Sequence, residues 1–212
     1  MLEALQRAAY RARVYRFVSL PDYVRTLGPM VDAQGVEELV VLLRESGLGQ
    51  DARELISSPF KPKPPHGRYQ GRFSDGSVGV FYGALERETA QEEVTSFCVR
   101  VIFAGQDEGT RAFYQFAECD FAGDVKDLRL DGVQWQFLCS ADEGVYPICQ
   151  AIGREAVDEG LDGLVTRSAR RAAGTNAPVF RESALANPQL NEYWCITRDA
   201  EDGMVTAAPL KE

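Results

Sequence analysis

The chain has 212 residues, of which 45% are apolar and 26% charged, as is ordinary for a soluble globular protein. Its net charge of −9, from 32 acidic and 23 basic residues, repels phosphodiester backbones and anionic membrane surfaces. Nucleic acid and membranes are therefore not expected as partners, whereas a local basic pocket for a small anion is compatible with the composition.

Cysteine and histidine content restricts the chemistry further. The five cysteines are odd in number and show no C-x-x-C spacing, which favours reduced, buried thiols in a cytoplasmic protein. His66 is the sole histidine, so multi-histidine metal sites are excluded and no metal is expected. The N-terminal residues carry charges throughout, unlike a signal peptide, and no stretch reaches the roughly 18 apolar residues of a membrane span.

The N-terminal part of the chain is predicted to be mainly helical. Apolar residues at helical spacing predict an amphipathic helix over residues 2–12 and a second helix over residues 36–47. Between them, an alternating run predicts a strand over residues 14–18. Residues 57–66 hold four prolines, which predicts an extended connector to the rest of the chain.

The remainder of the chain is predicted to be rich in strands. Helical patterns are confined to residues 88–94, where a helix begins, and residues 146–159, where Gly160 ends a helix. Runs of β-prone or apolar residues cover 94–104, 110–119, 125–130, 161–165 and 176–180. Strands with few intervening helices predict an α+β fold rather than regular βαβ alternation. The G-x-G-x-x-G and P-loop patterns of common nucleotide sites are not present.

Three side chains on consecutive predicted elements are candidates for a ligand site. Arg72, followed by Phe73, precedes a Ser-Asp-Gly turn, where a guanidinium can clamp phosphate or simply lie at a strand edge. Tyr82 ends an apolar run and can stack on an aromatic ligand or pack in the core. Glu93 lies beside apolar residues of the predicted helix, where a carboxylate costs free energy unless it has a partner or a function.

A second group of candidates follows residues 161–165. The hydroxyl of Ser168 can bind a phosphate or ribose, or cap a turn. Arg170 belongs to a local basic cluster in an acidic protein, which favours a site for a small anion. Asn176 is either a ligand contact or an ordinary turn residue.

Together the two groups resemble the RES-domain family, named for its arginine, glutamate and serine. Residues 71–94 match an Arg-Phe before a glycine turn, a tyrosine ten residues later and a Thr-Ala-x-x-Glu motif whose glutamate lies eleven residues beyond. Residues 160–180 match a serine-x-arginine followed by a glycine and an asparagine. Thr166-Arg167 departs from the tyrosine-proline that the family usually has before the serine.

The resemblance implies an α+β fold similar to ADP-ribosyltransferases, with split, bent antiparallel sheets flanked by helices. It implies an NAD⁺-consuming toxin that cleaves the nicotinamide–ribose bond as a phosphorylase or glycohydrolase, with NAD⁺ as substrate and no metal. A protein ADP-ribosyltransferase and an inactive NAD-binding module are the alternatives. Expected partners are a helix-turn-helix antitoxin of the Xre type or an immunity protein. Formation of a homodimer is a further alternative.

The resemblance also implies roles for the candidate residues and an organisation of the chain. Glu93 stabilises positive charge on the ribose and Tyr82 stacks on nicotinamide. The remaining residues bind phosphate, ribose or the nicotinamide end: Arg72, Phe73, Ser168, Arg170 and Asn176. We expect a helical region over residues 1–60 that packs on a catalytic domain over 61–200, with a tail at 201–212, and we favour one continuous domain over 1–200.

Overall fold

The computed structural model describes residues 2–19, 51–61, 70–105, 111–129, 133–199 and 201–210, together with Gly35, Glu38, Val41, Leu42 and Glu45. The strands are β1 (Arg7–Ser19), β2 (Phe81–Ala84), β3 (Arg111–Asp127), β4 (Gly163–Arg167), β5 (Thr175–Val179), β6 (Leu185–Arg198) and β7 (Val205–Pro209). The α-helices are α3 (Ala52–Ser57), α4 (Arg87–Phe97) and α5 (Tyr146–Asp158). Short helical turns are η2 (Ser58–Phe60), the π-helix η4 (Cys98–Ile102), η5 (Val133–Cys139), η6 (Glu143–Val145) and η7 (Glu182–Ala184).

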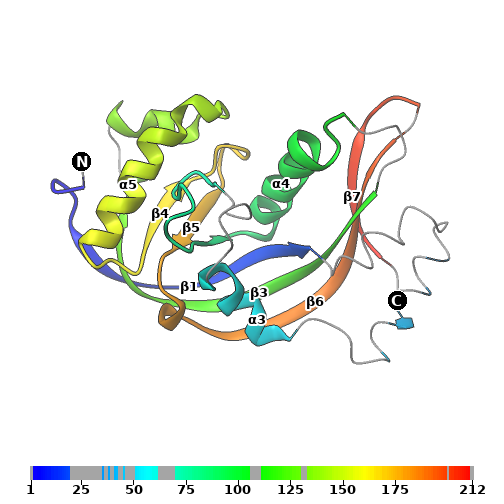
Figure 1. Ribbon diagram of the computed structural model, residues 1–212, viewed down its shortest axis with the longest axis horizontal. Helices are drawn as coiled ribbons and strands as arrows, with labels where there is room; N and C mark the ends of the chain where they lie inside the picture. Colours follow the sequence, from blue (N-terminus) through cyan, green and yellow to red (C-terminus); the bar gives the residue numbers. More distant parts are fainter. Residues whose placement is uncertain are drawn as a thin grey trace.

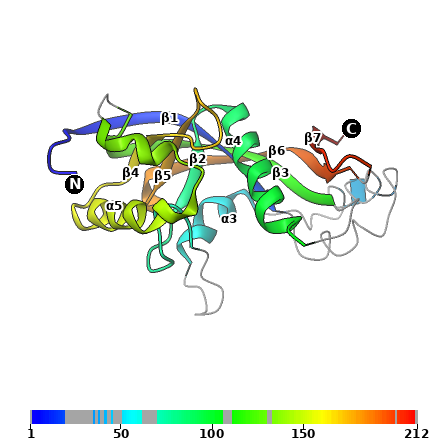
Figure 2. The ribbon, with the colours of Figure 1, turned by 90° about the horizontal axis from the view of Figure 1, so that it is seen from above.

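The strands form one bent sheet in the order β1-β2-β5-β4-β3-β6-β7. An additional pairing of β1 with β3 closes five of these strands into a ring, from which β6 and β7 extend. β3 and β4 pair in parallel, and the other described pairs are antiparallel. Figures 1 and 2 show α5 at one end of the sheet and β7 at the other. The predicted α+β class, with a bent, mostly antiparallel sheet flanked by helices, is confirmed.

Three apolar clusters hold these layers together. One cluster takes residues from every strand of the ring, including Val14, Phe81, Phe121, Val165 and Val179. A second joins α5 to the loops beside it, and a third lies between α4 and the long strands. Because β3 contributes to the first and third clusters, it is buried along most of its length. The burial of apolar area in these clusters is the main free energy that favours the fold.

The helix predicted over residues 2–12 is wrong, because residues 7–19 form β1. The small apolar residues of this segment are compatible with a helix locally, but β1 pairs with β3 continuously from Arg7 to Ser19. Arg13 on β1 also forms ion pairs with Glu118 and Asp120 on β3. Tertiary pairing therefore overrides local helix propensity. The predicted strand over residues 14–18 is confirmed as part of β1.

The strand predicted over residues 94–104 is also wrong, because α4 continues into η4. Burial along this segment has a helical period: Val94 and Cys98 are buried, whereas Val99 and Val101 are 48% and 51% exposed. The β-branched composition of this run misleads a local prediction, since packing against the sheet decides its conformation.

Other predictions from the sequence are confirmed or lie outside the described residues. The run at 110–119 lies in β3, the helix over 146–159 is α5, and residues 161–165 and 176–180 overlap β4 and β5. Gly160 ends α5 with a φ of 73°, as expected of a C-cap glycine. The described residues of the helix predicted over 36–47 are helical, and most of that range is not described. In the predicted extended connector at 57–66, residues 58–60 instead form the helical turn η2, whereas residues 62–66, His66 included, lie outside the described residues. The domain boundaries at residues 60 and 200 stay a prediction.

Alkylation of the native protein at about pH 8 is expected to modify Cys139 well before Cys98 and Cys119. Cys139 is exposed, whereas Cys98 and Cys119 are fully buried, and burial raises the pKa of Cys98 to about 11 and that of Cys119 to about 12. At that pH about one Cys98 thiol in a thousand is the reactive thiolate. Mass spectrometry after brief iodoacetamide treatment checks this, and equal labelling of Cys98 and Cys139 would contradict the packing of β3 against α4 and η4.

Among the described helices, none combines the length and apolar character needed to cross a membrane.

Candidate functional site

Helix α4 presents a polar face to β5 and to the loop that joins β4 to β5. We call this loop, residues 168–174, the serine loop. Glu86, Thr89 and Glu93 lie at positions i, i+3 and i+7, so they share one side of α4 and its N-cap. Each of them contacts the serine loop or β5, so these three polar side chains lie at the contact between α4 and the β4–β5 region.

Glu93 is held by two neutral hydrogen-bond donors. Its Oε1 accepts a hydrogen bond of 2.7 Å from Ser168 Oγ and another of 2.7 Å from Asn176 Nδ2. Within the described part of the chain, no Arg or Lys side chain forms an ion pair with this carboxylate. The site therefore fixes the position of a carboxylate without cancelling its charge.

Ser168 is oriented by its own loop. Its side chain is 3% exposed, and its Oγ accepts hydrogen bonds from the backbone N–H groups of Arg170 and Arg171 at 3.0 and 3.2 Å. Because a hydroxyl oxygen has two lone pairs, these contacts leave the O–H free to donate to Glu93. Ser168, Asn176 and Glu93 are thus brought together, as their positions in the two sequence blocks predict.

Arg72 and Arg170 both donate hydrogen bonds to a different segment, residues 138–141. Arg72 donates to the backbone oxygens of Leu138 and Ser140 at 3.2 and 2.7 Å, and Arg170 donates to that of Ala141 at 3.4 Å. All three acceptors are neutral carbonyls, and no described carboxylate pairs with either guanidinium. Both arginines therefore keep a net positive charge. Neither has a hydrogen bond to Glu93 among the described contacts.

Tyr82 and Phe73 are linked by a hydrogen bond in which the backbone N–H of Phe73 donates to Tyr82 Oη at 3.1 Å. The hydroxyl end of Tyr82 lies under the chain at Gly71, where an added Cβ would be only 2.4 Å from Oη. Burial of this end raises the pKa of Tyr82, although the residue as a whole is 39% exposed. The phenol therefore stays protonated while part of the side chain faces solvent. Phe73 lies in the core beside α5, so its side chain is not part of an open site.

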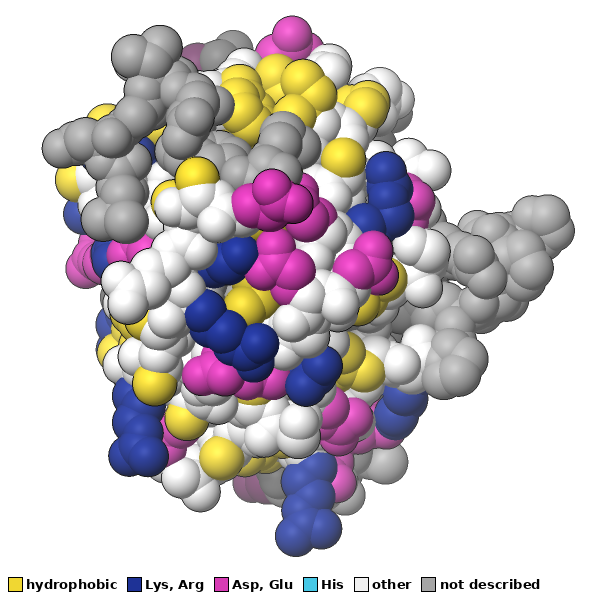
Figure 3. Space-filling view, turned by 90° about the vertical axis from the view of Figure 1, so that its left-hand side faces the viewer, with side chains coloured by type: hydrophobic (Ala, Val, Ile, Leu, Met, Phe, Trp, Pro, Cys, Tyr) yellow, Lys and Arg dark blue, Asp and Glu magenta, His cyan; other side chains and the backbone are white. Residues whose placement is uncertain are grey.

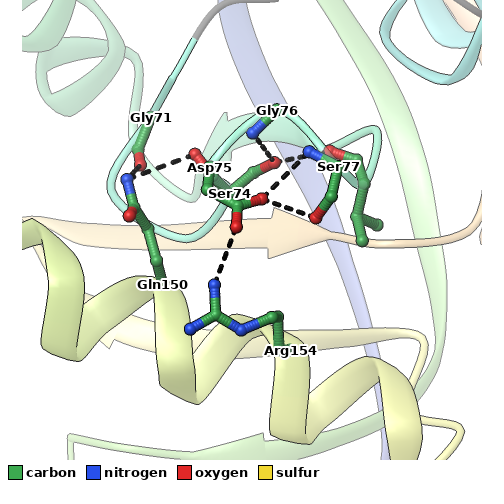
Figure 4. A network of polar contacts seen from close by, with 8 residues as sticks. Gly71, Ser74, Asp75, Gly76, Ser77, Gln150 and Arg154 are labelled. Atoms are coloured by element: carbon green, nitrogen blue, oxygen red, sulfur yellow. Dashed lines mark hydrogen bonds and ion pairs between the residues drawn. The ribbon is translucent and has the colours of Figure 1, made fainter.

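The loop that carries Arg72, residues 71–78, is fastened to α5 (Figure 4). Gln150 donates to the backbone oxygens of Gly71 and Ser74 at 3.1 and 3.4 Å, and Arg154 forms an ion pair of 2.8 Å with Asp75. At this end of the molecule, basic and acidic side chains are interspersed over the surface (Figure 3). Discrete side-chain contacts, rather than a broad field of one sign, thus position the Arg72 loop on α5.

Glu86 and Thr89 are residues of the site that the sequence did not single out. Thr89 Oγ1 donates to Glu86 Oε2 at 2.6 Å, and the same oxygen of Glu86 accepts from the backbone N–H of Thr175 at 2.9 Å. The available signal was helical spacing, since Thr89 lies one turn before Glu93 in the Thr-Ala-x-x-Glu motif.

A hollow of about 320 Å³ lies on the β5 side of the serine loop. Its lining comes from the end of β3 and the turn after it, the end of β4, the end of the serine loop and the start of β5: Asp127, Arg129, Arg167, Ala172, Ala173, Gly174 and Thr175. Arg129 is paired with Asp127 at 2.6 Å, which offsets part of the positive charge in the hollow. Among the described residues, no group of three or more His, Cys, Asp or Glu side chains is arranged to hold a metal ion.

These features define an α+β protein with a fixed carboxylate between a helix and a loop, and with two arginines that lack a carboxylate partner among the described residues. The chain belongs to the RES-domain family, since the model of the RES domain matches residues 47–199. No curated protein matches the chain. Among solved structures, the MbcT–MbcA toxin–antitoxin complex of M. tuberculosis is similar, with a TM-score of 0.45 and 13% sequence identity over 92% of this chain and 87% of that chain.

Proposed function

We propose that this protein is a toxin that consumes NAD⁺ by cleaving the bond between nicotinamide and ribose. The observation that carries the proposal is the Glu93 carboxylate, which two neutral donors hold in place and which no described cation neutralises. An oriented negative charge is the feature that stabilises positive charge as it develops on a sugar ring. Membership of the RES-domain family supports the assignment of NAD⁺ as the substrate.

The proposed reaction is the transfer of a glycosyl group. The bond between the anomeric carbon of the ribose and the nicotinamide nitrogen breaks, and its electron pair leaves with neutral nicotinamide. An oxygen of water or of inorganic phosphate then forms a bond to the same carbon. The products are nicotinamide with ADP-ribose and a proton, or nicotinamide with ADP-ribose 1″-phosphate. Glu93 stabilises the charge on the ribose during this exchange.

The other candidate residues bind and orient the substrate in this proposal. Arg72 and Arg170 attract the pyrophosphate, because no described carboxylate pairs with either side chain and each guanidinium has five N–H donors. The exposed part of Tyr82 stacks on nicotinamide. Ser168 and Asn176 hold Glu93 and contact the ribose. No step requires a metal.

A partner that neutralises the activity is part of the proposal. A protein that depletes NAD⁺ harms the cell that makes it, so the RES-domain resemblance leads us to propose a cognate antitoxin of the Xre type or an immunity protein. A cytoplasmic location and a homodimer also stay predictions. Expression with and without the neighbouring gene, followed by growth measurements, would show whether such a partner is encoded there.

Incubation of the purified protein with NAD⁺ tests the proposed reaction. We expect release of nicotinamide, measured by chromatography, and the second product identifies the acceptor. ADP-ribose 1″-phosphate formed only with added phosphate indicates phosphorolysis, and ADP-ribose indicates hydrolysis. Incubation with labelled NAD⁺ and cell lysate tests the alternative of a protein ADP-ribosyltransferase, because label on a protein band indicates ADP-ribosylation. Binding of NAD⁺ without nicotinamide release would instead identify an inactive module and refute the proposal.

A further inference from the structure

Thr89 is a fully buried polar residue at the contact between α4 and the serine loop. Its hydroxyl donates to Glu86 Oε2 at 2.6 Å and accepts a hydrogen bond of 3.3 Å from Arg171 Nη1. Through this single oxygen, a carboxylate at the N-cap of α4 is connected to an arginine of the serine loop. A buried hydroxyl with both a donor and an acceptor contact is costly to remove, since its partners are then left unsatisfied.

The serine loop also approaches Thr89 more closely than a side chain would allow. A Cβ added to Gly174 would lie 2.5 Å from Thr89 Oγ1 and 2.9 Å from Thr89 Cγ2. Glycine at position 174 therefore permits the loop to close against the helix. The hydroxyl and the methyl group of Thr89 both lie against Gly174, so together they limit how closely the loop approaches the helix.

Closure of the loop on Thr89 determines the environment of Ser168. The backbone N–H of Ser168 donates to the carbonyl of Gly174 at 2.8 Å, and the N–H of Gly174 donates to the carbonyl of Arg171 at 2.9 Å. The backbone N–H of Arg171 is in turn one of the two donors to Ser168 Oγ. Both loop residues that approach Thr89, Arg171 and Gly174, therefore form hydrogen bonds with Ser168, whose O–H donates to Glu93.

We propose that Thr89 is a positioning residue, which holds the serine loop so that the Ser168 hydroxyl points at Glu93. Thr89 acts through Arg171 and Gly174 and does not touch the substrate. The link to catalysis rests on the proposed NAD⁺ cleavage, whereas the ordering of the loop is a property of the protein alone.

The experiment compares Thr89→Val, which keeps the shape and removes the hydroxyl, with Thr89→Ser, which keeps the hydroxyl. Thr95→Val is the matched control, because it lies on the same helix about 200° away from Glu93. Arg171→Met removes the contact from the loop side and leaves the buried helix face intact. Hydrogen exchange at the Arg170 and Arg171 amides is measured for each protein, together with kcat and KM for nicotinamide release.

We expect Thr89→Val and Arg171→Met to speed exchange at these two amides about tenfold and to lower kcat about tenfold with little change in KM. Thr89→Ser and Thr95→Val should stay within about twofold of the wild type. Unchanged exchange in both Thr89→Val and Arg171→Met would overturn the proposal, as would a fall in kcat that Thr89→Ser shares in full. If the wild type releases no nicotinamide, the proposed function fails, and the exchange rates still decide whether Thr89 orders the loop.

Discussion

Replacing Glu93 by glutamine is expected to lower kcat for nicotinamide release by about two to three orders of magnitude. Glutamine keeps an oxygen that can accept hydrogen bonds from Ser168 and Asn176, so the arrangement of the site is largely preserved. The substitution removes the negative charge, which the proposed mechanism needs when positive charge develops on the ribose. The loss should therefore fall on kcat, with KM for NAD⁺ changed much less.

Glu92→Gln is the matched control for this substitution. Glu92 is the neighbouring residue on α4 and is exposed, so its replacement makes the same change in net charge outside the site. Its kcat is expected to stay within about twofold of the wild type, because exposed charges are screened by solvent and salt. Steady-state kinetics of the three proteins checks both expectations. Undiminished turnover by Glu93→Gln would exclude a charged role for Glu93.

Replacing Gly153 by alanine is expected to destabilise the protein by about 2–3 kcal/mol. A Cβ at this position would lie 2.1 Å from the backbone oxygen of Phe73, so α5 and the Arg72 loop would have to move apart. The direction of the effect is diagnostic, because glycine to alanine inside a helix ordinarily stabilises it by about 1 kcal/mol. Since Phe73 follows Arg72, the same movement should also weaken binding of NAD⁺.

Arg154→Ala is the control that removes the ion pair between α5 and the Arg72 loop without changing the close packing at Gly153. Arg154 is next to Gly153 on α5, and its ion pair with Asp75 is about half exposed. Removing the pair is expected to cost under about 1 kcal/mol. Denaturant unfolding of the wild type and the two variants measures these differences. Gly153→Ala with wild-type or higher stability would contradict the close approach of α5 to Phe73.

Much of the fold class could be predicted from periodicity, because α5 and β3 have strong local patterns. The apolar stripe of α5 and its C-cap glycine identify that helix, and alternation of aromatic and small residues identifies β3. The first half of β1, over residues 7–13, and the end of α4 could not be predicted in this way. In both segments, the contacts that decide the conformation come from residues far along the chain, such as the partners of β1 on β3.

Strands β6 and β7 were not predicted for a related reason. β6 is rich in polar residues and contains Pro188, so it lacks the alternation of a half-buried strand. Its pairing with β3 has two register shifts, and Asn187 beside Pro188 adopts a positive φ of 50°. Such irregularities are stabilised by the partner strand, so the local sequence of β6 does not predict them.

The contacts around Glu93 could be predicted only from motif spacing. Glu93, Ser168 and Asn176 each have an ordinary alternative explanation, and only the combined spacing of the two blocks suggested that they meet. The contacts of Arg72 and Arg170 with residues 138–141 could not be predicted, because their acceptors are backbone carbonyls, which every residue carries. The identity of the side chains therefore gives no information about which residues accept these hydrogen bonds.

The closed ring of strands bears on when the protein can become active during its synthesis. β1 near the N-terminus pairs with β3 at separations of up to 119 residues, from Arg7 to Lys126. Asn176, 83 residues beyond Glu93, must also be in place before the carboxylate has both of its donors. Such non-local contacts form late in folding, and a nascent chain that ends before Asn176 carries Glu93 without them. Translation and ring closure together therefore impose a delay, so that the site is complete only after most of the chain has left the ribosome.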